Sequence, residues 1–267
     1  MPAVDIHHPG TLHDALRTRA DGAVPLAGGT DLMVEVNFGQ TRPETVVALR
    51  RLAELQDWEG PRIGAGVTWR RIEREGPKAL AEAARTVGSP QIRNAATIGG
   101  NLATASPAGD GHPFLAATDS SIEVASVRGS RLIRWDEFFT GVKKTALESD
   151  ELVVAVHLPD RLPTRQAFAK VGVRNAMVIA TVCCVVTRDD DGATTVALGS
   201  VAPTVIRARR AEEMISNELG PSSAALDRFQ RLVEEEVSPI TDHRSTERYR
   251  RHAAGVLARR LLERCLR

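Results

Sequence analysis

Two stretches of the chain combine paired glycines with a threonine, and this combination is suited to binding phosphate groups. The first stretch spans residues 26–32 (LAGGTDL) and the second spans residues 94–101 (NAATIGGN). Glycine lacks a Cβ atom, so a glycine-rich turn can bring its backbone N–H groups close to an anion. Each stretch alone is also compatible with an ordinary turn. Together they predict one ligand with two phosphates, held from both sides.

Residues beside the glycines add further hydrogen-bonding groups to this predicted site. Thr30 and Thr97 offer hydroxyl groups, and Asn101 offers an amide. Asp31 and Asp110 need another role, because a carboxylate that faces a phosphate is repelled. We expect these two carboxylates to accept hydrogen bonds from sugar or ring N–H groups. The backbone donors are expected from Gly28, Gly29, Gly99 and Gly100.

Other motifs for nucleotide binding or hydrolysis are absent from the sequence. Residues 64–69 (GAGVTW) lack the last glycine of the Gly-x-Gly-x-x-Gly fingerprint, and neither a Walker loop nor a Gly-x-Ser-x-Gly elbow occurs. The three cysteines are Cys183, Cys184 and Cys265, without a Cys-x-x-Cys spacing. We therefore expect packed thiols at 183 and 184, and no metal or iron–sulfur site within this chain.

Charge and hydropathy exclude further classes of function. The 267 residues include 35 basic and 34 acidic side chains, so the net charge of +1 gives no general attraction to nucleic acid or anionic lipid. No apolar run reaches the ~20 residues of a membrane span. Residues 1–8 lack the basic and apolar regions of a signal peptide. These features predict a cytoplasmic protein that neither binds nucleic acid nor inserts into a membrane.

Residue patterns divide the chain into two predicted domains, 1–160 and 161–267. The boundary falls at residues 159–163, where two prolines bracket polar residues. Short helices and strands alternate before it, including a hairpin around residues 128–130. Three antiparallel strands are expected after it, at residues 166–171, 177–187 and 194–201. Two closing helices are expected to begin at caps, one at Ser223 and one at Ser245 or Thr246.

Several segments resemble one known family. Residues 26–32 and 89–110 are similar to the flavin-binding (medium) subunit of the molybdenum hydroxylases, which include carbon monoxide and xanthine dehydrogenases. Residues 199–212 and 245–261 resemble the C-terminal domain of the same subunit. The resemblance implies an α+β fold: a two-lobed FAD-binding domain of the vanillyl-alcohol-oxidase (PCMH) type, followed by a domain with a three-stranded antiparallel sheet packed on helices.

The resemblance also implies which residues bind FAD. Two loops would hold the pyrophosphate, an acidic residue and an apolar residue would contact the cofactor, and a lysine would lie near the flavin. These residues are Ala27, Gly28, Gly29, Thr30, Asp31, Thr97, Ile98, Gly99, Gly100, Asn101, Asp110, Val153 and Lys170. Val87 stands where some members have an aromatic residue beside the flavin ring. A Gly99→Val substitution should fill the space of the pyrophosphate and leave the fold largely intact.

The implied function is electron transfer within a larger enzyme. Electrons would leave an organic substrate at molybdenum on a molybdopterin-binding large subunit and cross the [2Fe-2S] clusters of a small subunit. They would then reach FAD on this chain and pass to an acceptor such as NAD, oxygen or a quinone. This chain would contribute no catalytic acid or base and no metal ligand.

Two other functions remain open from the sequence. One is a stand-alone FAD-dependent oxidoreductase that acts directly on a small molecule. The other is a scaffold whose FAD site has decayed, which the intact glycine motifs argue against.

Overall fold

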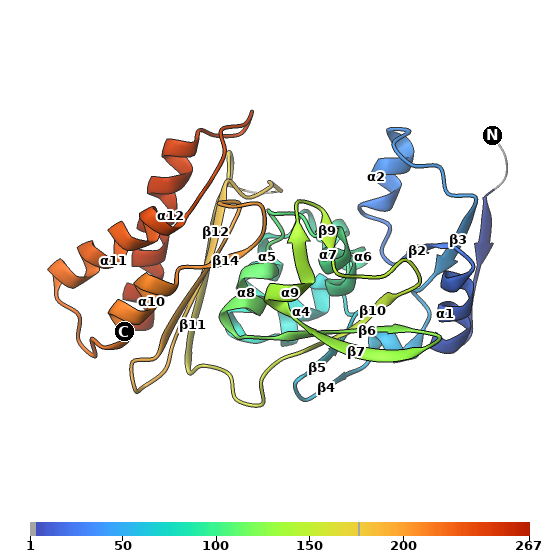
Figure 1. The fold of residues 1–267 in the computed structure, drawn as a ribbon, viewed down its shortest axis with the longest axis horizontal. Coiled ribbons are helices and arrows are strands. Elements are labelled where there is room, and N and C mark those ends of the chain that lie inside the picture. The colour runs from blue at the N-terminus through green and yellow to red at the C-terminus, as the bar shows by residue number, and fades with distance from the viewer. Residues whose placement is uncertain (1–3, 176) are drawn as a thin grey trace.

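Three units lie side by side in the computed structural model, which describes residues 4–175 and 177–267 (Figure 1). A first lobe covers residues 4–56, a second lobe covers residues 57–158, and a C-terminal unit begins at residue 165. The first three residues of the expected domain 1–160 lie outside the described residues. The combination of two α/β lobes with an antiparallel sheet and helices confirms the predicted α+β class.

The first lobe contains a small parallel sheet. Its strands, in spatial order, are β1 (Asp5–His7), β3 (Thr45–Ala48) and β2 (Val24–Leu26). Parallel neighbours need crossover connections, and helices α1 (Leu12–Ala20) and α2 (Leu32–Asn37) lie within them. Thr11 caps α1, because its hydroxyl oxygen accepts the N–H of Asp14. A short helix, α3 (Ala53–Gln56), ends the lobe.

The second lobe is built on an antiparallel sheet with β10 at its centre. Its strands, in spatial order, are β4 (Trp58–Glu59), β5 (Arg62–Gly64), β10 (Leu152–His157), β6 (Ser121–Ser126) and β7 (Gly129–Arg134). The predicted hairpin around residues 128–130 is confirmed, since β6 pairs with β7 and Ser126 faces Gly129.

Six helices of the second lobe follow β5 in the chain. They are α4 (Trp69–Glu75), α5 (Lys78–Thr86), α6 (Pro90–Ala95), α7 (Ile98–Thr104), α8 (His112–Ala117) and α9 (Trp135–Phe138). Of these, α7 and α9 pack against this second sheet, whereas α5 and α8 pack against the strands of the C-terminal unit. A two-stranded ribbon of β8 (Phe139–Gly141) and β9 (Lys144–Thr145) follows them. The second glycine motif, expected as a turn, is instead the first turn of α7. Helix formation is possible there because Thr97 caps the helix in front of the two glycines.

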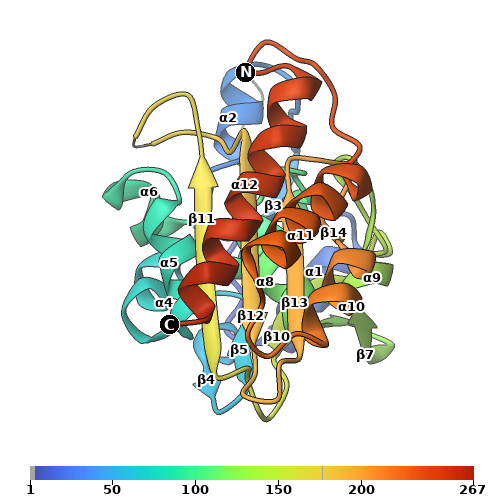
Figure 2. The same cartoon turned by 90° about the vertical axis from the view of Figure 1, so that its left-hand side faces the viewer.

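The C-terminal unit is a sheet covered by helices on its outer face, which Figure 2 shows. The strands are β11 (Arg165–Val171), β12 (Val182–Arg188), β13 (Thr194–Gly199) and β14 (Ile206–Arg207). The helices are α10 (Arg209–Ser216), α11 (Ser223–Glu236) and α12 (Glu247–Cys265). The three expected strands are present, although β12 begins at Val182 and not at the expected residue 177, and the two-residue β14 adds a fourth at the edge. Ser222 and Thr246 cap α11 and α12.

Both faces of this C-terminal sheet are buried. On β12, Cys183 and Val185 belong to the same apolar core as the second lobe, whereas Cys184 and Val186 belong to the core under α11 and α12. The alternation follows from the two-residue period of a strand. The expectation that Cys183 and Cys184 are packed thiols is confirmed, since both are fully buried. The sheet therefore presents one face directly to the second lobe.

Candidate functional site

A cavity of about 950 Å³ lies between the lobes, and residues of both glycine motifs line it. Residues 27–32 contribute from the first lobe. Thr97, Gly99, Gly100 and Asn101 contribute from the start of α7. Ile179, from the loop between β11 and β12, adds the C-terminal unit to the wall. The volume is at the upper end for small-molecule sites, as a dinucleotide-sized ligand requires.

The first motif leaves backbone donors free. It directly follows β2, at the carboxyl edge of the parallel sheet, where α/β folds commonly bind ligands. The N–H groups of Gly28, Gly29 and Thr30 donate to no acceptor among the residues that the structure describes. Gly29 has a φ of +71°, a conformation that favours glycine. The motif is therefore a cluster of unpaired N–H groups beside the cavity, as the sequence predicts.

Gly28 also fixes the distance between the two lobes. A Cβ atom at this position would lie 1.9 Å from the carbonyl oxygen of Ala95, at the end of α6. Only glycine allows so close an approach. The first motif is consequently packed against the chain that leads into the second.

In the second motif the N–H groups of Gly99 and Gly100 already donate to acceptors of this chain. This corrects the expectation that both glycines offer free donors. Gly99 N–H donates to the carbonyl oxygen of Ala65 over 2.9 Å, and Gly100 N–H donates to Thr97 Oγ1 over 3.0 Å. The N–H of Ile98 donates to Val67 O. The bonds to Ala65 and Val67 fasten the start of α7 to the loop after β5, and the bond to Thr97 caps the helix.

The expected effect of Gly99→Val is also corrected. A Cβ atom at Gly99 would lie 2.6 Å from the Cβ of Ala65 and 2.8 Å from its carbonyl oxygen, so Gly99→Val would disturb the fold itself. The side chain of Ile98 is 1% exposed and belongs to the core, not to the cavity wall. Gly100 is different, because a Cβ there would meet only Thr97 Oγ1, at 3.2 Å.

Polar side chains of both motifs also line the cavity. The hydroxyl hydrogens of Thr30 and Thr97 have no acceptor within the described part of the chain. Asn101 lines the cavity, and its Oδ1 is buried without a partner there. Asp31 also lines the cavity, and its Oδ2 accepts a hydrogen bond from the Thr104 hydroxyl over 2.9 Å.

Asp110 and Lys170 form a buried ion pair at the wall of the cavity. Lys170 Nζ lies 2.7 Å from Asp110 Oδ2 and also donates to the carbonyl oxygen of Thr86 over 3.0 Å. Burial raises the pKa of Asp110 to about 6, although the Lys170 ammonium acts to lower it. Asp110 lines the cavity, whereas Lys170 lies behind it. Lys170 therefore does not line the cavity itself but contacts Asp110, which does.

Apolar residues form other parts of the wall. Val153 on β10 and Val87 after α5 both line the cavity, together with Ile92 and Ile179. The structure thus brings Val153 and Val87 to the site from elements 66 positions apart in the chain. Apolar side chains of this kind can cover an apolar ring of a ligand and remove it from water.

Two arginines that were not predicted from the sequence, Arg19 and Arg50, also line the cavity. Arg50 follows β3, which pairs with β2, so it lies at the same sheet edge as the first motif. The Arg50 guanidinium has no bonding partner among the described residues. Arg19 donates to the carbonyl oxygen of Ala23. Arg50 could have been predicted as a site residue from its position just after a buried strand, because ligands commonly bind at the carboxyl ends of parallel strands.

His112 has a structural role. It is buried, its Nε2 lies 3.2 Å from the carbonyl oxygen of Asn101, and its ring packs on Phe139 at 4.3 Å. Burial lowers the pKa of His112 to about 4, so the imidazole is neutral at pH 7. The side chain does not line the cavity.

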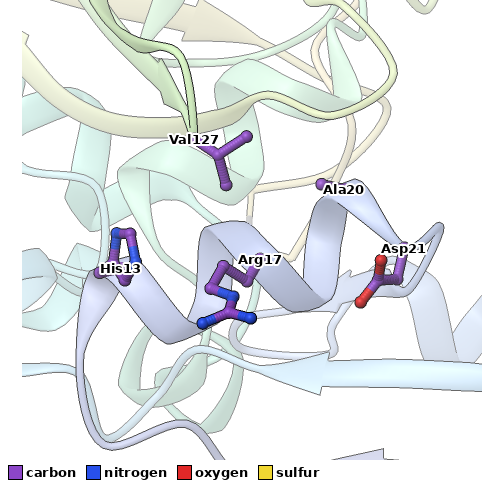
Figure 3. Close-up of a pocket in the computed structure, with 5 residues that line it drawn as sticks. All are labelled: His13, Arg17, Ala20, Asp21 and Val127. Atoms are coloured by element: carbon purple, nitrogen blue, oxygen red, sulfur yellow. The ribbon is translucent and has the colours of Figure 1, made fainter.

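A second hollow lies on the outside of α1. Its volume is about 420 Å³, and His13, Arg17, Ala20 and Asp21 line it together with Val127 from the turn between β6 and β7 (Figure 3). None of the predicted site residues lies there. Across the described ranges, no group of three or more His, Cys, Asp and Glu side chains is arranged to hold a metal ion. None of the described helices is long and apolar enough to cross a membrane.

Comparison with known proteins agrees with this architecture. A family described as "FAD binding domain in molybdopterin dehydrogenase" matches residues 2–161, and the "CO dehydrogenase flavoprotein C-terminal domain" matches residues 167–265. The xanthine dehydrogenase FAD-binding subunit of Escherichia coli O157:H7 is 32% identical, over 96% of this chain and 94% of that subunit. The nicotinate dehydrogenase FAD-subunit of Eubacterium barkeri is 37% identical, over 71% and 70%.

Among solved structures, a chain of carbon monoxide dehydrogenase from Hydrogenophaga pseudoflava superposes with a TM-score of 0.89. It is 28% identical, and the match covers 99% of this chain and 98% of that one. The fold and these matches define an FAD-binding oxidoreductase subunit. The chain belongs to the family of FAD-binding medium subunits of the molybdenum hydroxylases.

The residues at the cavity fit FAD. Unpaired N–H groups at residues 28–30 suit a diphosphate, and the volume suits a dinucleotide. Asn101 Oδ1 and Asp110 Oδ1 are buried acceptors that lack a partner in the described structure. A donor from a ligand would remove the cost of leaving them unsatisfied.

Proposed function

We propose that this chain is the electron-transfer link of a larger oxidoreductase. In this proposal FAD bound to the chain receives electrons from the [2Fe-2S] clusters of a partner subunit and delivers them to a separate acceptor. The observation that carries the proposal is the cavity lined by both glycine motifs, in a chain that matches FAD-binding subunits over almost its whole length. We assign FAD binding mainly to residues 1–160 and a supporting role to residues 161–267.

The diphosphate would be held largely by the first lobe. The N–H groups of Gly28, Gly29 and Thr30 are free to donate to phosphate oxygens. Arg50 adds a positive charge at the same sheet edge, and charge-assisted hydrogen bonds are the stronger kind. The hydroxyl of Thr97 would donate from the second motif. The remaining residues of both motifs, Ala27, Asp31, Ile98, Gly99, Gly100 and Asn101, would shape the loops or contact the cofactor.

The ring systems would lie against the apolar parts of the wall. Val153 and Val87 present apolar surface to the cavity, and Val87 stands in for an aromatic residue as cover for the flavin. Asp110 would accept a hydrogen bond from the cofactor at Oδ1, which has no partner among the described residues. We assign no catalytic acid or base of this chain to the organic substrate.

The partners follow from the family. Relatives are named as FAD subunits of dehydrogenases, which supports a large molybdopterin-binding subunit and a small [2Fe-2S] subunit as partners. The organic substrate would react on the large subunit. The terminal acceptor would be NAD, oxygen or a quinone, and the cytoplasm would be the site of the reaction.

Purification from the native cells tests this proposal. The tagged chain should carry FAD and should co-purify with two further subunits that contain iron and molybdenum. Addition of the organic substrate should bleach the flavin absorbance of the complex but not of the isolated chain. A chain that purifies alone, binds FAD and oxidises a small molecule without partners would contradict the proposal and favour the stand-alone oxidoreductase.

A further inference from the structure

The Asp110–Lys170 pair joins the second lobe to the C-terminal sheet. Asp110 lies between α7 and α8, and Lys170 lies on β11. Their side chains are 9% and 7% exposed, and Nζ lies 2.7 Å from Oδ2. Both charges are therefore shielded from water, and each is compensated chiefly by the other. Removal of one partner from a buried pair leaves an uncompensated charge, which is costly.

Strand geometry explains why a residue of the C-terminal sheet reaches this position. On β11, Phe168 packs in the core shared with the second lobe, while Ala167 and Ala169 pack toward α12. Lys170 is two residues after Phe168 and so faces the second lobe as well. It donates to Thr86 O, which holds the ammonium beside α5. The long side chain spans the junction and ends at the cavity wall.

Lys170 is the only cation that contacts Asp110 among the described residues. Cys183, opposite Lys170 on β12, also faces Asp110, but burial raises the pKa of its thiol, which stays neutral. His112, from α8, is buried and neutral at pH 7. Neither neighbour can replace the charge of the lysine.

The two oxygens of Asp110 have different environments. Oδ2 accepts from Lys170, whereas Oδ1 is buried and has no partner within the described residues. The Thr86 hydroxyl also acts to lower the pKa of this carboxyl group. Asp110 lines the cavity, and we assign Oδ1 to a ligand donor because it is the oxygen without a hydrogen bond among the described residues. A carboxyl group that becomes protonated loses acceptor capacity at one oxygen.

We propose that Lys170 is a positioning residue, which keeps Asp110 ionised and turned toward the cavity so that the C-terminal sheet controls how tightly FAD is held at neutral pH. This inference rests on the proposed placement of FAD in the cavity. It assigns Lys170 a role through Asp110 and not by contact with the flavin. The C-terminal unit thereby contributes to a cofactor site that lies mostly in the other two units.

The inference predicts a specific dependence of FAD affinity on pH. The raised pKa of Asp110, about 6, means that the carboxyl becomes protonated as the pH falls through 6. FAD affinity of the native protein should therefore be constant above pH 7 and fall below pH 6. Without Lys170, the effect of burial on the pKa of Asp110 is no longer opposed by a positive charge, so this pKa should be higher. The loss of FAD affinity should then begin at a higher pH.

The experiment compares Lys170→Met with the native chain. FAD dissociation constants are measured by flavin fluorescence from pH 5.5 to pH 9, and the melting temperature of the FAD-free protein reports folding. Lys170→Met should bind FAD about tenfold more weakly at pH 7 and approach native affinity toward pH 9. Arg264→Met is the matched control, because Arg264 pairs with Glu82 across the same junction but away from the cavity. Its pH profile should equal that of the native chain.

A further variant keeps the inference testable if Lys170→Met does not fold. Asp110→Asn has no ionisable group at this position, so its FAD affinity should not vary between pH 5.5 and pH 7. A Lys170→Met profile that superposes on the native one, or that is weaker by the same factor at every pH, would overturn the inference. So would an Asp110→Asn profile that keeps the native loss below pH 6. If the native chain binds no FAD at any pH, the proposed FAD site fails instead.

Discussion

The hydroxyl of Thr104, near the end of α7, donates a hydrogen bond to the carboxylate of Asp31 in the first glycine motif over 2.9 Å. The two residues are 73 positions apart and belong to different lobes. Both line the cavity, so this bond closes part of its wall. Asp31 thus joins the two lobes through Oδ2.

Loss of this bond should loosen the cavity. We expect Thr104→Val to lower the free energy of unfolding by about 1 kcal/mol and to weaken FAD binding several-fold, because the bond tethers the two lobes. Urea denaturation and flavin fluorescence measure the two effects. Thr18→Val is the control, since the Thr18 hydroxyl donates only to Asp14 O within α1. FAD affinity that is equal in the two variants would argue against a role of the Thr104–Asp31 bond in the site.

The two glycines of α7 should respond differently to alanine. At Gly100 the added methyl group meets only Thr97 Oγ1, and alanine favours a helix over glycine by about 1 kcal/mol. Gly100→Ala should therefore keep or raise the melting temperature of the FAD-free protein and weaken FAD binding by filling cavity space. Gly99→Ala should lower the melting temperature, because its methyl group collides with Ala65. Native FAD affinity in folded Gly100→Ala would show that the cofactor does not approach this residue.

Arg50 should contribute charge to cofactor binding. We expect Arg50→Gln to weaken FAD binding about tenfold and to reduce the dependence of the dissociation constant on salt. Arg51→Gln is a matched control, because Arg51 is its exposed neighbour and does not line the cavity. Titrations at low and high ionic strength make the comparison. Equal losses in both variants would indicate a general charge effect and not a local contact.

His112 should make the FAD-free protein less stable in acid. Its pKa of about 4 in the folded protein lies below the ordinary value near 6.5, so the unfolded chain binds more protons between these pH values. The contribution of His112 to the free energy of unfolding is fully present above pH 6.5 and is lost as the pH falls toward 4. From pH 7 to pH 5 the loss is about 2 kcal/mol.

Replacement of His112 by a side chain that does not titrate tests the expected loss of unfolding free energy between pH 7 and pH 5. His112→Gln should show a smaller loss of unfolding free energy between pH 7 and pH 5 than the native chain. Asp110 acts in the opposite direction, because its raised pKa of about 6 makes the folded protein bind extra protons between about pH 4 and pH 6. That contribution is common to both proteins and cancels in the difference. An unchanged pH dependence would show that His112 titrates alike in folded and unfolded chains.

Much of the fold follows from local sequence. The β6–β7 hairpin, the three long strands of the C-terminal sheet and the Thr246 cap of α12 were predicted from alternation or caps. Helices α6 and α7 were not, because six or seven residues are too few to show a helical period and α7 begins with two glycines. Their local signals are the caps at Ser89 and Thr97, together with Pro90 at the first position of α6.

In the site, too, some features were predicted from local sequence and others were not. The positions of Gly28 to Thr30 and of Asp110 at the cavity were predicted, since a motif fixes its own local geometry. The bond from Gly99 N–H to Ala65 and the bond from Lys170 to Asp110 connect residues far apart in sequence. No local pattern specifies such pairs, because they depend on how the lobes and the C-terminal sheet pack together. Their tertiary packing also decided which glycines keep free N–H groups.

A structure of the chain determined with bound FAD tests the central claim most directly. The account predicts density for one FAD in the cavity, with the diphosphate within hydrogen-bonding distance of the N–H groups of Gly28, Gly29 and Thr30. It also predicts a cofactor atom that donates to Asp110 Oδ1. Density for FAD at another surface, or a cavity without density at saturating FAD, would contradict the account.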